Sequence, residues 1–458
     1  MQRPRVFSAE SVYKGEATRT TRDIFICAAR KLDVSSHLEE DARVVIGTNR
    51  DRLKGGNGNE FRQAPGVRLR HARFDFAAYG LCGGQVVIGD IDDLSGLYAD
   101  INGPRAVEGI KMAIADFGGA ALGQPIELLT ADHQNKPDIG ASKFREWADT
   151  KRLTMLLGGS NTGVSLAMAP IAKERKVPFF AIGAAGASLT GKDCNAYMIQ
   201  YNYNTTALAN GTAKAILDQG GKTWFFITAD YAFGTQLQQA ATKVVEAGGG
   251  KVVGSVRVPL SSSDFSSYLL QAQGSGARVV GLANAGADFS NSLKAAHEFG
   301  LTETMKPAAL LAFITDIHSV GLEMAQGLYL TAAWYWDLND KSRAFGKRFL
   351  DKTGAMPTYN QAAYYSATTT YLNAVKAVGA TDADKVMDEL RKTKVDDMYT
   401  SDGVIRPDGL LQHSMHVMQV KTPAESKGPW DYYKLVKTMS GEEAYGSLSD
   451  STCPLVKK

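Results

Sequence analysis

The feature of this chain that most constrains its fold is a regular alternation of short apolar segments with longer amphipathic ones, which begins near Gln85. Residues 86–88 form a short apolar run, and an amphipathic segment follows from Pro104 to the pair Gly118-Gly119. Its apolar residues recur every three or four positions, which is the spacing of the buried face of a helix, and proline suits a first helical turn. Apolar strands that alternate with helices of about 10–15 residues are typical of parallel sheets covered on both faces.

This alternation occurs in two successive sets. In the first set, we expect strands at residues 86–88, 126–129, 153–157 and 177–182 and helices at 104–117, 138–147 and 164–173. In the second set, we expect helices at residues 207–217, 237–247, 265–272 and 289–299 and strands at 224–228, 252–258, 279–283 and 308–312. Two sets of about four strand–helix units predict an α/β fold with two doubly wound lobes rather than one large sheet.

Beyond residue 330 the alternation becomes less regular. Here we expect strands at residues 328–334, 415–420 and 430–436 and helices at 360–378 and 384–392. This part is too small and too irregular for a third domain. We therefore expect it to run back across both lobes and to tie them together by several crossings.

The composition excludes several classes of protein. Of the 458 residues, 44% are apolar and 22% are charged, which is close to the globular average and unlike disordered or fibrous chains. A net charge of +3 over this length gives no field that would attract nucleic acid. No apolar run approaches the roughly 20 residues of a membrane-spanning helix. We expect neither a nucleic-acid-binding protein nor an integral membrane protein.

Residues 1–84 differ in pattern from the rest of the chain. They carry 15 lysine and arginine residues against 10 acidic ones and contain few periodic apolar stretches. A signal peptide would show a basic start followed by about 7–15 apolar residues, and this pattern is not seen. Residues 76–82 end at Cys82 like a weak lipoprotein site, but nothing apolar precedes them. We expect a poorly structured extension, for instance from a misassigned start or a shifted frame; the alternative is a regulatory or targeting arm.

Two loops of small residues follow neighbouring predicted strands of the first lobe. They comprise residues 158–163 and 183–188, and the first opens directly onto a predicted helix. In open α/β sheets, ligands bind beyond the carboxyl ends of the strands, and free N–H groups at a helix start suit a carboxylate or phosphate. The loops are therefore candidates for a ligand site. The alternative is that they are tight turns in which glycine serves the backbone conformation alone.

Residues at the corresponding positions of the second lobe would face these loops across a cleft. Tyr231 offers a ring face and a hydroxyl, and Asn284 offers a donor and an acceptor. In the first lobe, Tyr98 could supply an aromatic wall, and Asp316, after a strand of the second lobe, could balance a positive group. Each of these residues could equally serve packing or lie on the surface.

Catalytic and metal-binding signatures are not found. The chain has no P-loop, G-x-G-x-x-G or H-E-x-x-H motif, and Ser160 stands one place too early for a G-x-S-x-G turn. His133 and His297 have no evident triad partner. The four cysteines form no C-x-x-C pair and could be thiols or form one or two disulfides, with composition alone favouring thiols. We expect no enzyme activity, no metal and no cofactor.

Six short segments are jointly typical of one family. They are Asp93-Leu94-Ser95-Gly96, Gly109-Ile110-Lys111-Met112-Ala113, Gly123-Gln124-Pro125-Ile126-Glu127, Ala131-Asp132, Ala187-Ser188-Leu189-Thr190 and Asp230-Tyr231-Ala232-Phe233-Gly234. From about Gln85 onward, about four fifths of the chain resembles the type I periplasmic substrate-binding proteins of branched-chain amino-acid-type ABC transporters, the leucine/isoleucine/valine-binding family. Segments 189–194 and 453–456 resemble a proteobacterial subgroup of it.

The resemblance implies two Rossmann-like lobes joined by a hinge of three crossings, which agrees with the two sets and the returning tail. We place the crossings near Tyr201, Thr331 and Thr400. The first lobe is then expected at residues 85–203 and 332–400, the second at 204–331 and 401–445, and a C-terminal tail at 446–458.

The resemblance also implies a ligand carboxylate held by the small-residue loops. The matching positions are Asn161, Thr162, Gly183, Ala184 and Ala185, and the family's second-lobe tyrosine matches Tyr231. Ala185 departs from similar amino-acid binders, which have a threonine there, and the acidic partner of the ligand's ammonium has only an approximate counterpart in Thr315 or Asp316. We therefore expect a small carboxylate, with branched-chain or other amino acids, aromatic acids, amides and keto acids left open.

The function that the resemblance implies is that of a solute-binding component that closes its hinge on a ligand and delivers it to the permease subunits of an ABC importer. It implies a periplasmic location, and the subgroup's matching segments imply a disulfide between Cys194 and Cys453, which reverses the interpretation from composition. We expect a monomer. The alternative is a ligand-sensing regulator on the same fold, which would need a partner protein because no DNA-reading segment is apparent. An α/β enzyme is disfavoured by the missing catalytic groups.

Overall fold

The computed structural model describes residues 84–457 of the chain. The chain divides into two units, Met1–Cys82 and Gly83–Lys458, and the described residues belong to the second. The extension predicted for residues 1–84 therefore lies, except for its last residue, outside the described residues. None of the helices in the described part combines the length and apolar character that crossing a membrane requires.

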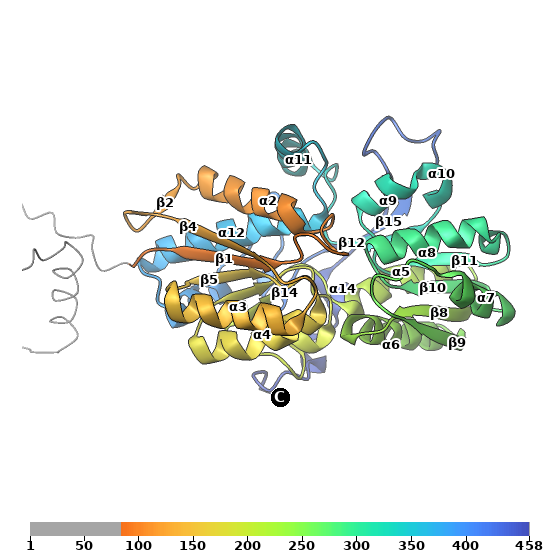
Figure 1. The fold of residues 1–458 in the computed structure, drawn as a ribbon, viewed down its shortest axis with the longest axis horizontal. Helices are drawn as coiled ribbons and strands as arrows, with labels where there is room; N and C mark the ends of the chain where they lie inside the picture. The colour runs from red at the N-terminus through yellow and green to blue at the C-terminus, as the bar shows by residue number, and fades with distance from the viewer. Residues whose placement is uncertain (1–83, 458) are drawn as a thin grey trace, which may run out of the picture. The chain divides into compact units, whose positions relative to one another are not determined.

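The first parallel sheet has helices on both of its faces (Figure 1). Its order is β4–β1–β5–β6–β7, with β1 (Val87–Asp92), β4 (Glu127–Asp132), β5 (Met155–Gly158), β6 (Phe179–Ala181) and β7 (Met198–Gln200). The helices beside it are α2 (Gly103–Asp116), α3 (Pro137–Thr150), α4 (Thr162–Arg175) and α12 (Tyr359–Val378). Val87 and Ile91 pack in one buried cluster with α3 and α4, whereas Ile88 belongs to the cluster that contains α2 and α12. Because strand side chains alternate with a period of two, this division confirms the prediction of a doubly covered parallel sheet.

The second parallel sheet repeats this plan. Its order is β11–β10–β8–β9, with β8 (Thr223–Ala229), β9 (Lys251–Val258), β10 (Val279–Ala283) and β11 (Lys306–Ala309). Its helices are α5 (Thr205–Asp218), α6 (Ala232–Ala247), α7 (Ser266–Gly274) and α8 (Ala287–Glu298). We refer to the first sheet with its helices as the first lobe and to the second sheet with its helices as the second lobe. The α/β fold with two doubly wound lobes, predicted from the two sets, is thereby confirmed.

A small antiparallel sheet lies against α5 of the second lobe. Its order is β12–β15–β16, with β12 (Tyr329–Ala332), β15 (Met415–Val420) and β16 (Tyr433–Met439). The remaining described elements are short or peripheral: β2 (Ala120–Ala121), β3 (Gln124–Pro125), α9 (Ile314–Val320), α10 (Leu322–Ala325), α11 (Asp340–Thr353), α13 (Ala383–Lys392), β13 (Val404–Ile405), β14 (Leu411–Gln412), α14 (Gly441–Tyr445) and 3-10 turns at Ala187–Thr190, Leu301–Glu303 and Leu448–Asp450.

The chain passes three times between the lobes. It leaves the first lobe after β7, returns after β12 to α11, and leaves again after α13, which packs on α12. Helix α11 is fixed to the first lobe by an ion pair of 2.8 Å between Nη2 of Arg348 and Asp116 in α2. On the third passage, the hairpin of β13 and β14 lies beside β7, where Leu410 bridges to Gln200. The hinge of three crossings implied by the resemblance is therefore present, while the residue boundaries of the lobes stay a prediction.

Several elements of the fold were not expected from the sequence, among them helix α11 and strand β7. Helix α11 was missed because it is mostly polar, and only a few of its residues, such as Phe345 and Phe349, are buried. Strand β7 was missed because it has three residues. The strand predicted at residues 430–436 begins three residues later, at Tyr433. Trp430 adopts φ +71°, which is incompatible with the extended backbone of a strand.

Cys194 and Cys453 form a disulfide with a Cα–Cα distance of 5.7 Å. This distance lies within the usual range for disulfides and confirms the pairing implied by the resemblance. The interpretation as free thiols, which composition favoured, is wrong for these two residues. The bond fastens the C-terminal segment to the turn that precedes β7. Cys27 and Cys82 lie outside the described residues.

Candidate ligand-binding site

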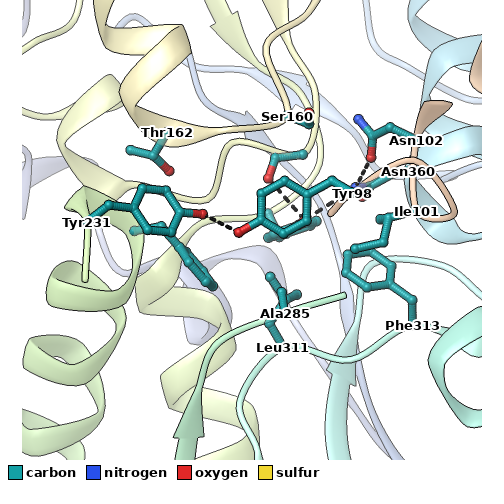
Figure 2. Close-up of a pocket in the computed structure, with 13 residues that line it drawn as sticks. Tyr98, Ile101, Asn102, Ser160, Thr162, Tyr231, Ala285, Leu311, Phe313 and Asn360 are labelled. Atoms are coloured by element: carbon teal, nitrogen blue, oxygen red, sulfur yellow. Dashed lines mark hydrogen bonds between the residues drawn. The ribbon is translucent and has the colours of Figure 1, made fainter. Parts of the chain in front are cut away.

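A cavity lies where loops at the carboxyl ends of the two parallel sheets approach one another (Figure 2). The space between its walls is about 280 Å³, part of it open to solvent. The lining residues come from the connections after β1, β5, β6, β7, β8, β10 and β11 and from the first turn of α12. They are Tyr98, Ile101, Asn102, Ser160, Thr162, Gly183, Tyr203, Tyr231, Phe233, Ala285, Leu311, Phe313 and Asn360.

Four of the ten residues predicted to bind ligand line this cavity, namely Tyr98, Thr162, Gly183 and Tyr231. Asn161, Ala184 and Ala185 are chain neighbours of lining residues but do not line it themselves. Asn284, Thr315 and Asp316 do not line it either. The structure thus brings together both small-residue loops and both tyrosines, and it leaves the proposed ammonium partners outside.

The start of α4 joins the two small-residue loops. Asn161 caps the helix, because its Oδ1 accepts hydrogen bonds from the backbone N–H groups of Gly163 (2.8 Å) and Val164 (3.3 Å). Thr162 faces the cavity, and its Oγ1 accepts a hydrogen bond from the backbone N–H of Gly186 in the second loop (3.2 Å). The side chain of Asn161 therefore orients the helix, while that of Thr162 is the one in reach of a ligand.

At Ala184 and Ala185 of the second loop, the carbonyl groups are engaged and the amide groups are not. The carbonyl oxygen of Ala184 accepts a hydrogen bond from Nε2 of Gln200 (2.7 Å), and that of Ala185 accepts one from the N–H of Thr205 (2.7 Å). Within residues 84–457, the backbone N–H groups of Ala184 and Ala185 have no acceptor. Unengaged N–H groups beside a cavity are suited to an anion.

The glycines of both loops are also required by the backbone. Gly158 has φ +112°, and a Cβ atom there would lie 2.4 Å from the carbonyl oxygen of Ile91. Gly183 has φ +91°, and a Cβ atom there would lie 3.0 Å from the amide nitrogens of both Asn102 and Asn360. The purely conformational role considered from the sequence is therefore real, and it coexists with a place beside the cavity.

Two tyrosines from opposite lobes meet across the cavity. The hydroxyl groups of Tyr98 and Tyr231 are 2.6 Å apart, and Figure 2 shows them pointing toward each other. Burial raises the pKa of both phenols far above its usual value, so both remain neutral. A second contact across the lobes runs from the backbone N–H of Ser188 to Oε1 of Gln236 (3.0 Å).

A buried network of amide side chains forms the wall opposite Tyr231, and sequence analysis missed it. Nδ2 of Asn360 donates to Oδ1 of Asn102 (2.8 Å), and Nδ2 of Asn202 donates to Oδ1 of Asn360 (2.6 Å). Nδ2 of Asn102 also donates to Oδ2 of Asp92 (3.0 Å). These residues come from β1, the start of α2, the first crossing and α12, so no local pattern in the sequence could have grouped them.

Asn284 and Asp316 are committed to their own helices. Nδ2 of Asn284 donates to Oγ of Ser292 in α8 (3.1 Å). Oδ2 of Asp316 accepts a hydrogen bond from the N–H of Phe313 (2.9 Å) and so stabilises the start of α9. The Oγ1 of Thr315 is buried without a partner among the described residues. Their roles as ligand residues stay predictions that the cavity lining does not support.

We expect Asp316→Asn to flatten the pH dependence of stability between pH 5 and pH 8. Burial raises the pKa of Asp316 to about 8, so the folded protein holds a proton there that the unfolded chain, with a pKa of about 4, releases. The free energy of unfolding therefore falls as pH rises through this window, by at most about 1.4 kcal/mol per pH unit for one proton. Urea unfolding at several pH values measures it, and equal slopes for both proteins would contradict the prediction.

The sequence model of the periplasmic binding protein family matches residues 85–429. The chain belongs to this family. The family consists of ligand-binding proteins rather than enzymes. Within residues 84–457, no group of three potential metal ligands comes together.

Two solved structures that are similar to this periplasmic binding protein come from Burkholderia. A periplasmic binding protein of Burkholderia mallei is 55% identical, with a TM-score of 0.80 over 81% of this chain and 99% of that one. A branched-chain amino acid ABC transporter periplasmic ligand-binding protein of Burkholderia xenovorans is 42% identical, with a TM-score of 0.72 over 81% and 100%. A Leu/Ile/Val-binding protein homolog of Brucella abortus is 28% identical over 46% of this chain, and the chain spans 53% of that protein's length.

Proposed function

We propose that this protein is the ligand-binding component of an ABC importer, and that it captures a small carboxylate-bearing molecule in the periplasm and presents it to a membrane permease. The observation that carries the proposal is the cavity itself, which lies between two lobes at the carboxyl ends of both sheets. It has unengaged backbone N–H groups beside it on one lobe and an aromatic hydroxyl in its wall on the other. The names of the Burkholderia and Brucella relatives support the transport role.

The ligand's carboxylate would lie against the first lobe. The start of α4 brings Thr162 to the cavity, and the N–H groups of Ala184 and Ala185 are free beside it. The N-terminus of a helix favours an anion because its N–H groups carry partial positive charge. Several N–H donors on one carboxylate with an aromatic contact are consistent with a micromolar dissociation constant, about −8 kcal/mol.

Transport would follow from closure of the hinge. A ligand shifts the equilibrium between open and closed forms only by its greater affinity for the closed one. Tyr231 and Gln236 of the second lobe already contact Tyr98 and Ser188 of the first, so a closed arrangement is available to this chain. The permease would then distinguish the closed form, in which edges of both lobes are brought together. We propose that the protein acts as a monomer.

We expect a screen of small acids to raise the unfolding temperature and Tyr231→Ala to abolish most of that rise. A ligand at 100 times its dissociation constant adds about 2.7 kcal/mol to the stability of the folded state. The screen covers branched-chain amino acids, benzoate-type acids, 2-oxo acids, amides and urea, measured by thermal shift. If an amide or urea binds and no acid raises the unfolding temperature, the proposal that the ligand carries a carboxylate is contradicted.

The control for the tyrosine is Tyr268→Ala, since Tyr268 lies on α7 in the same lobe and away from the cavity. Truncating Tyr231 removes its contact with Tyr98. Because Tyr231 lies outside the sheets, the unfolded fraction without ligand should match that of the control. Unchanged ligand affinity in Tyr231→Ala would remove this residue from the site.

A further inference from the structure

We propose that the cavity selects small carboxylic acids that carry an apolar body and no cationic group, and that it discriminates against amino acids of the same shape. This inference rests on the proposed function and specifies its substrate class. It is carried by the charges and the hydrogen-bonding capacity of the cavity wall.

The wall has no charge to offer an ammonium group. Among the described residues that line the cavity, none is acidic or basic. Asp92 lies behind Asn102 and is fully buried. Its carboxylate accepts hydrogen bonds from Asn102 and from the hydroxyl of Tyr364. The carboxyl group of Asp316 accepts from the N–H of Phe313 and lies outside the lining. A buried ammonium without an anionic partner costs several kcal/mol.

The polar groups of the wall have few free acceptors. Oδ1 of Asn102 is occupied by Nδ2 of Asn360, and Oδ1 of Asn360 is occupied by Nδ2 of Asn202. The carbonyl oxygen of Gly183 accepts from the hydroxyl of Tyr203 (3.2 Å). These three oxygens, which could have contacted an ammonium, are therefore already bonded to protein donors.

Donors, in contrast, are left over. Tyr98 and Tyr231 carry two hydroxyl hydrogens, and the bond between them uses one. Neither hydroxyl has another partner among the described residues, so one hydrogen is free. Thr162 uses its Oγ1 as an acceptor for Gly186, which leaves its own hydrogen free as well. Free donors on the wall match a ligand that presents oxygen acceptors.

The remainder of the wall is apolar. Ile101 of the first lobe and Phe233, Ala285, Leu311 and Phe313 of the second line it, and Figure 2 shows Ala285 and Leu311 below the tyrosine pair. A branched aliphatic or aromatic body would replace water against these side chains at about 25 cal/mol per Å² of apolar surface. The cavity thus combines donors for a carboxylate with an apolar enclosure for the rest of the molecule.

The decisive experiment compares matched ligands on the unmodified protein by isothermal titration calorimetry. Leucine and 4-methyl-2-oxopentanoate share one carbon skeleton and carboxylate and differ only in the ammonium or ketone at the second carbon; phenylalanine and phenylpyruvate form a second pair. We expect the oxo acid to bind about 100-fold or more tightly than the amino acid in at least one pair. An amino acid that binds equally well or better in both pairs overturns the inference, as does binding of no member of either pair.

This outcome is separable from the fate of the proposed function. If the amino acid binds equally well or better in both pairs, the inference fails and the role as a ligand-binding component stands. If no acid of the thermal-shift screen binds, the proposal that the ligand carries a carboxylate fails too.

A variant pair tests the charge argument directly. Ala285→Asp adds a carboxylate to the second-lobe wall, and Ala285→Asn adds a side chain of the same size without charge. We expect Ala285→Asp to weaken binding of the preferred oxo acid at least 10-fold more than Ala285→Asn does. Equal losses in the two variants, both verified as folded by circular dichroism, would show that charge plays no part and would contradict the inference.

Discussion

Replacing both Cys194 and Cys453 with serine is expected to lower the free energy of unfolding by about 2–4 kcal/mol. The disulfide joins residues 259 positions apart, so it closes a loop that contains the whole second lobe and all three crossings. A loop of this length strongly restricts the unfolded chain, and such restriction grows with the logarithm of loop length. In the folded state, the C-terminal segment is otherwise held to this turn by contacts such as the hydrogen bond from Oγ of Ser451 to the carbonyl oxygen of Thr190 (3.4 Å).

Urea unfolding followed by circular dichroism measures this effect. The matched comparison is the unmodified protein with and without a thiol reductant, which should reproduce the shift of the double variant. A midpoint that is the same in all three samples would contradict a stabilising role. We further expect the ligand affinity of the double variant to change by less than its stability, because neither cysteine lines the cavity.

Gly286→Ala is expected to weaken ligand binding about 10-fold or more by preventing closure of the lobes. Gly286 precedes α8 in the second lobe and has φ +62°. A Cβ atom there would lie 2.7 Å from the carbonyl oxygen of Leu97 and 3.2 Å from side-chain atoms of Ile101 and Tyr98, all in the first lobe. The backbone oxygen cannot turn aside as a flexible side chain would, so the closed form is penalised and the open form is not.

Gly321→Ala is the control for this prediction. Gly321 lies in the same lobe with φ +85°, but a Cβ atom there would meet nothing within 4 Å. Both variants carry the strain of an alanine at positive φ, about 1–3 kcal/mol, and only Gly286→Ala carries the clash between lobes. Calorimetry with the acid selected by the thermal-shift screen gives the dissociation constants. Equal affinities in the two variants would show that closure of the lobes does not require the close approach of Gly286 to Leu97.

The parts of the site that were predictable follow directly from the strand pattern. Thr162, Gly183 and Tyr231 each lie just beyond an apolar segment of the sequence, and the carboxyl ends of parallel strands meet at one edge of a sheet. Locating the strand ends was therefore enough to bring these residues together. Asn284 follows a strand by the same rule, yet its amide turns to Ser292 in its own helix, because a helix start satisfies short polar side chains locally.

The two lobes and the loops that border the cavity could be predicted from the sequence, because periodic burial and strand ends are local properties of the chain. The hydrogen-bond partners of the polar wall could not be predicted, because they come from distant segments. Asn102 and Asn360 are 258 positions apart and bond to each other, and Tyr98 and Tyr231 meet from different lobes. A polar group's partner depends on which distant segments the hinge and the packing bring within about 3 Å, and no residue-to-residue spacing encodes that distance.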